Sequence, residues 1–369
     1  MPAIDTFFDE LLRRGGSDLH LSVGHPPMAR LRGELVALTE HAVTMEQIEQ
    51  LLYQLLDDDR RTSFERQRGL DFAYTYGERA RFRASYFMKH TGPAAVFRTI
   101  PSHQLDAREL SIPPAVFDLA VRRSGLVLVA GPAGSGKTTT LAAMVSHINH
   151  TRRAHVLALE DPVEFVHTPQ RCLVTHREIG LDSRSFADAL RSALRENADV
   201  VLVGSLEDPR TMRSVLDLAI SGTMVLATIP ASTVADAVER FVGAFATNEQ
   251  PQIRALFADA LAGVISQQLL RRADGSGRVA AFEVLIANPA VAAAIRERRS
   301  ESLAGLIQAG TREGMQTADM SLQTLVAAGV VRARDALERV HDKQGFAKIP
   351  AVAERLGQES VNRADEPTV

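Results

Sequence analysis

The chain has 369 residues, enough for two or three domains, and its net charge of −3 gives no global attraction to nucleic acid or anionic lipid. Aromatic residues make up 5% of the chain and tryptophan is absent, which argues against base-stacking platforms. No apolar run approaches the ~20 residues that span a bilayer. We therefore expect no nucleic-acid partner and no membrane insertion.

Two features of the sequence favour a cytoplasmic location. The N-terminus is amphipathic and acidic, unlike a secretory signal peptide. A single cysteine, Cys172, cannot form an internal disulfide, which fits a reducing compartment.

The first hundred residues predict a small α+β domain, which we place at residues 1–104. Residues 4–14 carry apolar side chains at helical spacing, and residues 17–38 alternate like strands around a Pro-Pro turn. A second helix is expected at 45–58, ending in an acidic run, and strand alternation returns at 71–100. The polar segment 102–112 reads as a linker.

A glycine-rich turn follows the apolar run from Leu126 to Ala130 and leads into a helix-forming segment. Gly131, Gly136, Lys137 and Thr138 fit the pattern G-x-x-x-x-G-K-[ST]. Glycines let successive N–H groups point at phosphate oxygens, and the helix N-terminus adds its own N–H groups and dipole. Lys137 would reach the terminal phosphates and Thr138 would bind Mg²⁺. The predicted ATP-binding residues are Gly131, Pro132, Ala133, Gly134, Ser135, Gly136, Lys137, Thr138 and Thr139.

From residue 113 onward the pattern changes to alternating strands and helices, typical of a mostly parallel sheet with helices on both faces. The expected core spans 113–287, with strands at 125–130, 155–160, 199–204 and 223–228. After residue 250 we expect helices at 250–270, 289–298, 300–309, 317–328 and 333–343, with one strand at 279–286. Residues 288–345 would form a helical C-terminal part, and 346–369 a flexible tail.

An acidic cluster ends the second predicted core strand, at Glu160, Asp161 and Glu164. Ligands of parallel sheets bind at the carboxyl ends of the strands. Glu160 is therefore the candidate base that activates water, and Asp161 a structural or metal-linked partner. The alternative is that these acids cap a loop before Pro162.

The next two strands end without the groups expected beside a triphosphate. Ser205 follows the apolar run of the third strand, and serine cannot act as a carboxylate base. Thr228 stands where a γ-phosphate sensor could lie, and Pro230 after it has neither a side-chain donor nor a backbone N–H.

Three arginines at alternate positions, Arg79, Arg81 and Arg83, would share one face of a strand. Guanidinium groups suit phosphate oxygens, so these residues could serve a nucleotide held between domains or subunits. Arg98 is a candidate of the same type. A solvated strand face is the alternative.

Several ordered blocks together resemble the PilT/PilU branch of the type IV pilus and type II secretion ATPases. The blocks are GGSDLHLSVGHPPMARLRGEL, RFRASYF, AAVFRTIP, GLVLVAGPAGSGKTTTLAAM, LEDPVEFVH, HREIGLD, SFADALRSALRE and GMQTADMSL. The resemblance implies a PAS-like N-terminal domain, a RecA-like ATPase core and a homohexameric ring that binds ATP and Mg²⁺. Nucleotide would bind between one core and a neighbouring N-terminal domain, where Arg81, Arg83 and Arg98 would contribute. The implied work is pilus retraction at the cytoplasmic face of the inner membrane, through a membrane platform protein.

Two departures from the family pattern bear on hydrolysis. Family members usually have glutamate where Ser205 stands and histidine where Pro230 stands; Glu207 and His176 replace an arginine and a glutamine. Three readings follow: an active retraction motor with Glu160 as base, a helper that binds ATP in a mixed ring with an active paralogue, or a secretion and assembly ATPase. The third ranks last because one cysteine cannot build the zinc cluster that larger assembly ATPases carry.

Overall fold

The computed structural model describes residues 4–31, 33–77, 79–100, 110–340 and 342–364. Contacts divide the chain into two compact units, the first formed by residues 1–104 with 161–166 and the second by 105–160 with 167–369. Each unit combines one sheet with helices, which agrees with the predicted α/β class. Most of the predicted linker, residues 102–109, lies outside the described residues.

The first unit contains a six-stranded sheet in the order β3-β2-β1-β6-β5-β4, in which every neighbouring pair is antiparallel. Alternation on the long strand β5 buries Ala80, Phe82 and Ala84 against the helices, where the Phe8 ring stacks on Phe82 at 4.4 Å. The elements are α1 (Asp5–Arg13), β1 (Asp18–Ser22), β2 (Met28–Leu31), β3 (Glu34–Ala37), α2 (Met45–Tyr53), α3 (Asp58–Gln67), β4 (Gly69–Tyr76), β5 (Ala80–Lys89) and β6 (Gly92–Ile100).

The acidic run at 57–59 begins a helix instead of ending one. The helix expected at 45–58 stops at Tyr53, and α3 starts at Asp58. Asp57 is the N-cap of α3, because its carboxylate accepts the backbone N–H of Arg60 at 2.8 Å. Acidic residues favour a helix N-terminus, where they complement the helix dipole. The acidic run therefore indicates the beginning of α3.

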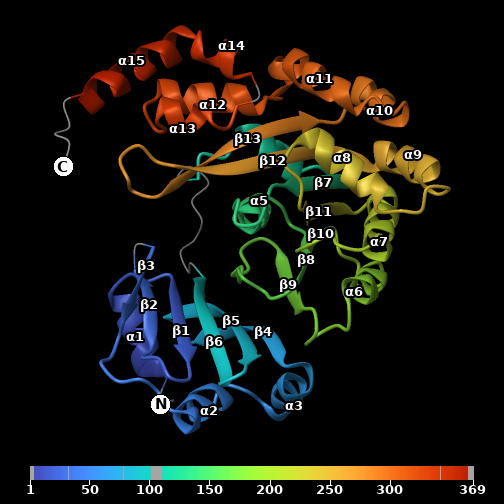
Figure 1. Ribbon diagram of the computed structural model, residues 1–369. Helices are drawn as coiled ribbons and strands as arrows, with labels where there is room; N and C mark the ends of the chain where they lie inside the picture. The colour runs from blue at the N-terminus through green and yellow to red at the C-terminus, as the bar shows by residue number, and fades with distance from the viewer. Residues whose placement is uncertain (1–3, 32, 78, 101–109, 341, 365–369) are drawn as a thin grey trace. The chain divides into compact units, whose positions relative to one another are not determined.

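The second unit contains a seven-stranded sheet in the order β13-β12-β7-β11-β10-β8-β9 (Figure 1). All neighbours are parallel except the antiparallel hairpin β12–β13. The carboxyl ends of β7, β11, β10 and β8 therefore meet at one edge. The strands are β7 (Gly125–Ala130), β8 (His155–Glu160), β9 (Leu173–Glu178), β10 (Val200–Val203), β11 (Met224–Ile229), β12 (Leu261–Arg271) and β13 (Arg278–Ile286).

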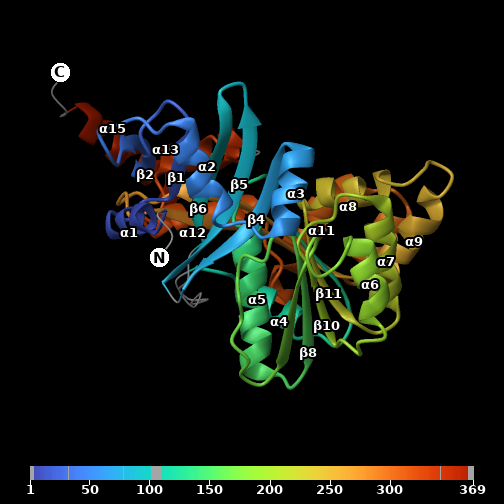
Figure 2. The ribbon, with the colours of Figure 1, turned by 90° about the horizontal axis from the view of Figure 1, so that it is seen from below.

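Helices cover both faces of this sheet, and Figure 2 shows α5 on one side with α6 and α7 on the other. Leu141 and Met144 of α5 share one core with Val156 and Ala158 of β8, whereas Leu157 and Leu159 belong to the opposite core. The helices are α4 (Pro114–Ala120), α5 (Lys137–Thr151), α6 (Phe186–Ala193), α7 (Pro209–Ile220), α8 (Val234–Gly243) and α9 (Gln250–Ala260).

Two strands of this sheet were not expected. The helix predicted at 250–270 ends at Ala260, and β12 takes the remaining residues between β7 and β13. A short apolar run is compatible with either a buried strand or a buried helix. Here it forms a strand because β7 and β13 pair with it on both sides. The edge strand β9 was also missed.

The C-terminal part is helical, as expected, but its helices extend further. Instead of a flexible tail from residue 346, two helices continue to residue 364; Val352 is fully buried, and Glu359 accepts the backbone N–H of Ala333 at 2.6 Å. The helices are α10 (Pro289–Arg296), α11 (Leu303–Ala309), α12 (Ala318–Ala327), α13 (Ala333–Leu337), α14 (Lys343–Ala347) and α15 (Pro350–Ala364). Within the described residues, none of the helices combines the length and apolarity required to cross a bilayer.

Candidate functional site

The loop between β7 and α5 has the backbone that a phosphate cradle needs. Gly131, Gly134 and Gly136 have φ values of +155°, +74° and +90°, which L-residues rarely adopt. A Cβ on Gly131 would lie 2.2 Å from Ser135 Oγ and 2.7 Å from the carbonyl oxygen of Gln267. The glycine at this position is therefore required by both conformation and space.

A residue that sequence reasoning missed, Gln267 on β12, holds the loop against the sheet. Its side-chain Nε2 donates to the carbonyl of Ser135 at 2.6 Å, and its Oε1 accepts the hydroxyl of Thr140 at 2.7 Å. Gln267 is 3% exposed. It therefore joins the end of the loop to the first turns of α5, and no local sequence signal marks it.

Lys137 and Ser135 have polar groups suited to a bound anion. Lys137 Nζ donates to the carbonyl oxygens of Gly131 and Pro132, each at 2.9 Å, and burial lowers the pKa of its ammonium. The buried Ser135 hydroxyl has no hydrogen-bond partner among the described residues. The cradle, this orphaned hydroxyl and the N-terminus of α5 fit a triphosphate tail.

Thr138 and Thr139 lie in the first turn of α5, directly after the lysine. The Thr138 hydroxyl is a hard oxygen ligand of the type that Mg²⁺ accepts together with phosphate oxygens. The donor set is thus compatible with the predicted metal role of Thr138.

Glu160 lies at the last position of β8 and is 6% exposed. Strand alternation puts it on the same sheet face as Val156 and Ala158, the face that α5 covers. Gly204, after β10, allows this close packing, because a Cβ there would lie 3.3 Å from Glu160 Cα. Asp161 and Glu164 belong to the segment 161–166 that is grouped with the first unit, so their roles stay predictions.

Two histidines accompany Glu160, and neither was assigned a role from the sequence. His176 on β9 places Nδ1 3.8 Å from Glu160 Oε1, and its Nε2 accepts the backbone N–H of His167 at 3.2 Å. The two rings are stacked at 5.8 Å. Burial, with a smaller contribution from His176, lowers the pKa of His167 to about 4.

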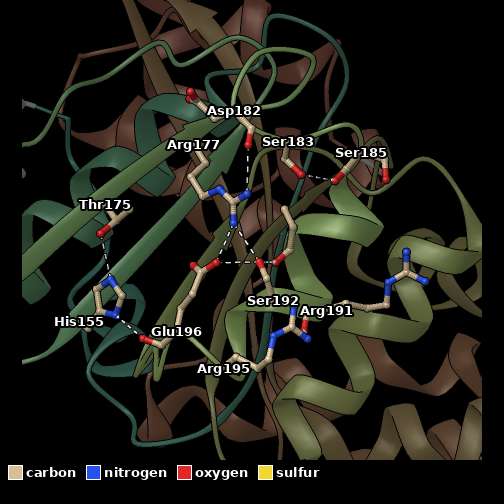
Figure 3. Close-up of polar contacts among 11 residues, drawn as sticks. His155, Thr175, Arg177, Asp182, Ser183, Ser185, Arg191, Ser192, Arg195 and Glu196 are labelled. Carbon is tan, nitrogen blue, oxygen red and sulfur yellow. Dashed lines mark hydrogen bonds and ion pairs between the residues drawn. The ribbon is translucent and has the colours of Figure 1, made fainter.

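The opposite side of β9 is fixed by a network around Arg177 (Figure 3). The Arg177 guanidinium donates to Ser192 Oγ at 2.9 Å, to Glu196 Oε1 at 2.8 Å and to the carbonyl of Asp182 at 3.1 Å. These contacts tie the edge strand to α6 and to the turn that follows β9.

The ends of β10 and β11 are occupied by local contacts. Ser205 donates its hydroxyl to Glu207 Oε1 at 2.9 Å, and Thr228 donates its hydroxyl to the carbonyl of Gly204 at 2.5 Å. Thr228 is therefore engaged in joining two strands. Pro230, one residue beyond β11, brings no side-chain donor to the sheet edge.

In the first unit, Arg81, Arg83 and Arg98 lie on the sheet face opposite the core, and Arg83 is directly paired with Arg98. Arg98 donates to the buried Asp18 at 2.8 Å. Burial raises the pKa of Asp18, but hydrogen bonds from Ser17 and Arg98 outweigh this and hold it below its ordinary value. Arg79 lies one residue before β5, and its guanidinium forms an ion pair with Asp9 at 2.7 Å. It is therefore not grouped with Arg81, Arg83 and Arg98.

Residues 1–338 match the family model described as type II/IV secretion system protein. The chain belongs to this family. The match spans both units, and it agrees with the resemblance drawn from the ordered motif blocks.

Individual relatives place the chain within the PilT/PilU branch of this family. It is 41% identical to the type IV pilus retraction ATPase PilT of Pseudomonas aeruginosa, over 90% of this chain and 97% of that protein. Identity to the type IV pilus ATPase PilU of the same organism is 34%, over 89% of this chain and 87% of that one. A crystal structure of the pilus retraction motor PilT with bound ADP superposes with a TM-score of 0.85 at 36% identity, covering 94% of this chain and 98% of that one.

Proposed function

We propose that the chain is an ATP-binding motor subunit of the type IV pilus machinery that acts in pilus retraction and twitching motility. The observation that carries the proposal is the glycine cradle at 131–136, built on the strand–helix pair β7–α5 and closed by Lys137. Support also comes from PilT of Pseudomonas aeruginosa, which is similar over nearly the whole chain, and from the crystal structure of a pilus retraction motor PilT that holds ADP.

The residues divide the work as follows. The backbone of 131–136 and Lys137 would bind the β- and γ-phosphates, and Thr138 would hold Mg²⁺, which neutralises phosphate charge when bound. Glu160 would orient and deprotonate the attacking water, with Asp161 and Glu164 as accessory acids. Arg81, Arg83 and Arg98 would meet the nucleotide of a neighbouring subunit, as guanidinium forks suit phosphate oxygens.

Turnover is proposed to be slow, because two sheet-edge positions have lost acid–base groups. Ser205 has no charge and is bound to Glu207, and Pro230 has no donor. Loss of one such group commonly costs ~10²–10⁴-fold in rate, and two losses in one site need not add. This observation favours a second role, in which the chain binds ATP in a mixed ring with an active paralogue. A secretion or assembly ATPase remains the third candidate.

The proposed assembly is a homohexamer or such a mixed ring, peripheral to the cytoplasmic face of the inner membrane, with a membrane platform protein as partner. Support for a place in the pilus machinery comes from the similarity to PilT and PilU, which are described as type IV pilus ATPases.

Steady-state ATP hydrolysis tests the account of turnover. The parent should turn over near background, and Ser205→Glu with Pro230→His should raise the rate. Because Ser205 contacts Glu207, the added carboxylate would meet a like charge, so Glu207→Arg is included in a triple variant. We expect the triple variant to be the fastest; robust turnover in the parent would reject slow hydrolysis.

A further inference from the structure

The contacts of His176 define which ring nitrogen carries its proton. The backbone N–H of His167 donates to Nε2 at 3.2 Å, so Nε2 is the unprotonated nitrogen of the neutral ring. Nδ1 therefore carries the proton. This nitrogen is buried and without a hydrogen-bond partner among the described residues, and it faces Glu160 Oε1 at 3.8 Å.

The backbone on either side of the His176 and His167 pair is held in place by other contacts. On the far face of β9, Arg177 is tied to Ser192 and Glu196 (Figure 3). The loop that carries His167 is fixed to α5 by Asn149, whose amide donates to the carbonyl of Thr168 at 2.8 Å and accepts the N–H of Gln170 at 3.0 Å. Turning the His176 ring away from Glu160 would break its hydrogen bond with the His167 backbone, which this framework keeps in place.

A buried carboxylate needs hydrogen-bond donors, and a rigid donor also fixes its direction. We propose that His176 is a positioning residue for Glu160: its Nδ1–H directs the carboxylate toward the attacking water. The inference rests on the proposed role of Glu160 in ATP hydrolysis. A contraction of about 0.6 Å from 3.8 Å would bring the two atoms to the upper limit of an N–H···O hydrogen bond, as happens when catalytic sites tighten around substrate.

Two amide substitutions distinguish the contributions of the two ring nitrogens of His176. In His176→Asn, the amide nitrogen can take the place of Nδ1 and keep the donor to Glu160. In His176→Gln, the amide oxygen can take the place of Nε2 and keep the acceptor for His167, but the donor to Glu160 is lost. We expect His176→Gln to slow single-turnover hydrolysis about tenfold and His176→Asn to remain within about threefold of the parent, since small misplacements of a catalytic group are costly.

The kinetic test uses excess protein over ATP, so that slow rates remain measurable. Nucleotide affinity should be unchanged in both variants, and neither substitution should slow a Glu160→Gln protein further. His150→Gln is the matched control, because His150 is exposed on α5 and its Nδ1 is hydrogen-bonded to the Ser146 carbonyl of its own helix. Equal rates for the Asn and Gln variants, or a further loss in the Glu160→Gln background, would overturn the proposal.

A spectroscopic measurement tests the same pair without nucleotide. In ¹⁵N-histidine-labelled protein, the resonance assigned to His176 should report the Nδ1–H tautomer and should move in Glu160→Gln. The Nε2–H tautomer, or no change in Glu160→Gln, would overturn the inference regardless of activity. If the proposed function is wrong, the protein will not bind ATP or its turnover will not depend on Glu160. These outcomes differ from those that would overturn the role of His176.

Discussion

At the scale of single residues, the loop at 131–136 depends on glycines for two different reasons. Gly134 has a positive φ of +74° but open space where a Cβ would point. Gly131 has both a φ of +155° and a Cβ position that overlaps Ser135 Oγ and the Gln267 carbonyl. Backbone strain alone disfavours a larger residue at position 134, whereas both backbone strain and close packing disfavour one at position 131.

These two glycines give a matched pair of substitutions. Gly134→Ala should cost about 1–2 kcal/mol of stability, the strain of one left-handed residue. Gly131→Ala should cost more, because the methyl group must displace a buried carbonyl, and it should also weaken ATP binding. Thermal unfolding and nucleotide titration would measure both effects; equal losses in the two variants would show that packing at Gly131 is unimportant.

The glycine-rich loop between β7 and α5 and the position of Glu160 could be predicted because both signals are local: a motif of fixed spacing, and an acid at the end of a strand. Gln267 and His176 could not. Gln267 reaches Ser135 across 132 positions of sequence, and His176 lies on a strand that the sequence pattern did not reveal. Their positions beside Ser135 and Glu160 arise from strand pairing, which a single sequence does not encode locally.

At the scale of elements, the errors occurred where tertiary partners decide between alternatives. The second half of 250–270 is apolar and becomes β12 because β7 and β13 pair with it on both sides. The acidic run at 57–59 forms the N-cap and first turn of α3, where the sequence pattern predicts a helix end. Strongly patterned elements, such as β7 and α5, were predictable from apolar runs and glycine spacing.

Helices α8 and α9 are joined by a charged clamp that gives a pH-dependent prediction. Arg254 is 5% exposed and donates to both oxygens of Glu239 at 2.8 Å. Hydrogen bonding from Arg254 is the largest of the effects that lower the pKa of Glu239 from 4.5 to about 2. A depressed carboxyl pKa stabilises the fold above pH 4.5, and this contribution is lost as pH falls toward 2.

Glu239→Gln should therefore destabilise the protein at pH 7, and the deficit relative to the parent should shrink below pH 4.5. The Glu239 side chain is 48% exposed, so solvent screening limits the expected loss to about 1 kcal/mol. Denaturant unfolding of parent and variant at several pH values measures the difference. A deficit that does not change with pH would contradict the clamp.

At the scale of the whole molecule, the second unit brings the cradle, Glu160, Ser205 and Pro230 to the carboxyl edge of one parallel sheet. This gathering follows from topology, because every strand that carries one of these residues runs in the same direction. The proposed phosphate-binding loop is held in place in this arrangement, whereas Ser205 and Pro230 follow β10 and β11 where the family usually has glutamate and histidine. We therefore predict that binding and cleavage of a triphosphate are separable properties of the chain.

Calorimetric titration of Mg-ATP into the parent and into Lys137→Ala tests the central claim most directly. The parent should give saturable heat, and Lys137→Ala should bind at least about tenfold more weakly, the effect of losing a charge-assisted contact. The thermal midpoint of Lys137→Ala without nucleotide shows whether the variant is folded. Absence of heat with the parent, or equal affinity in the folded variant, would contradict the account.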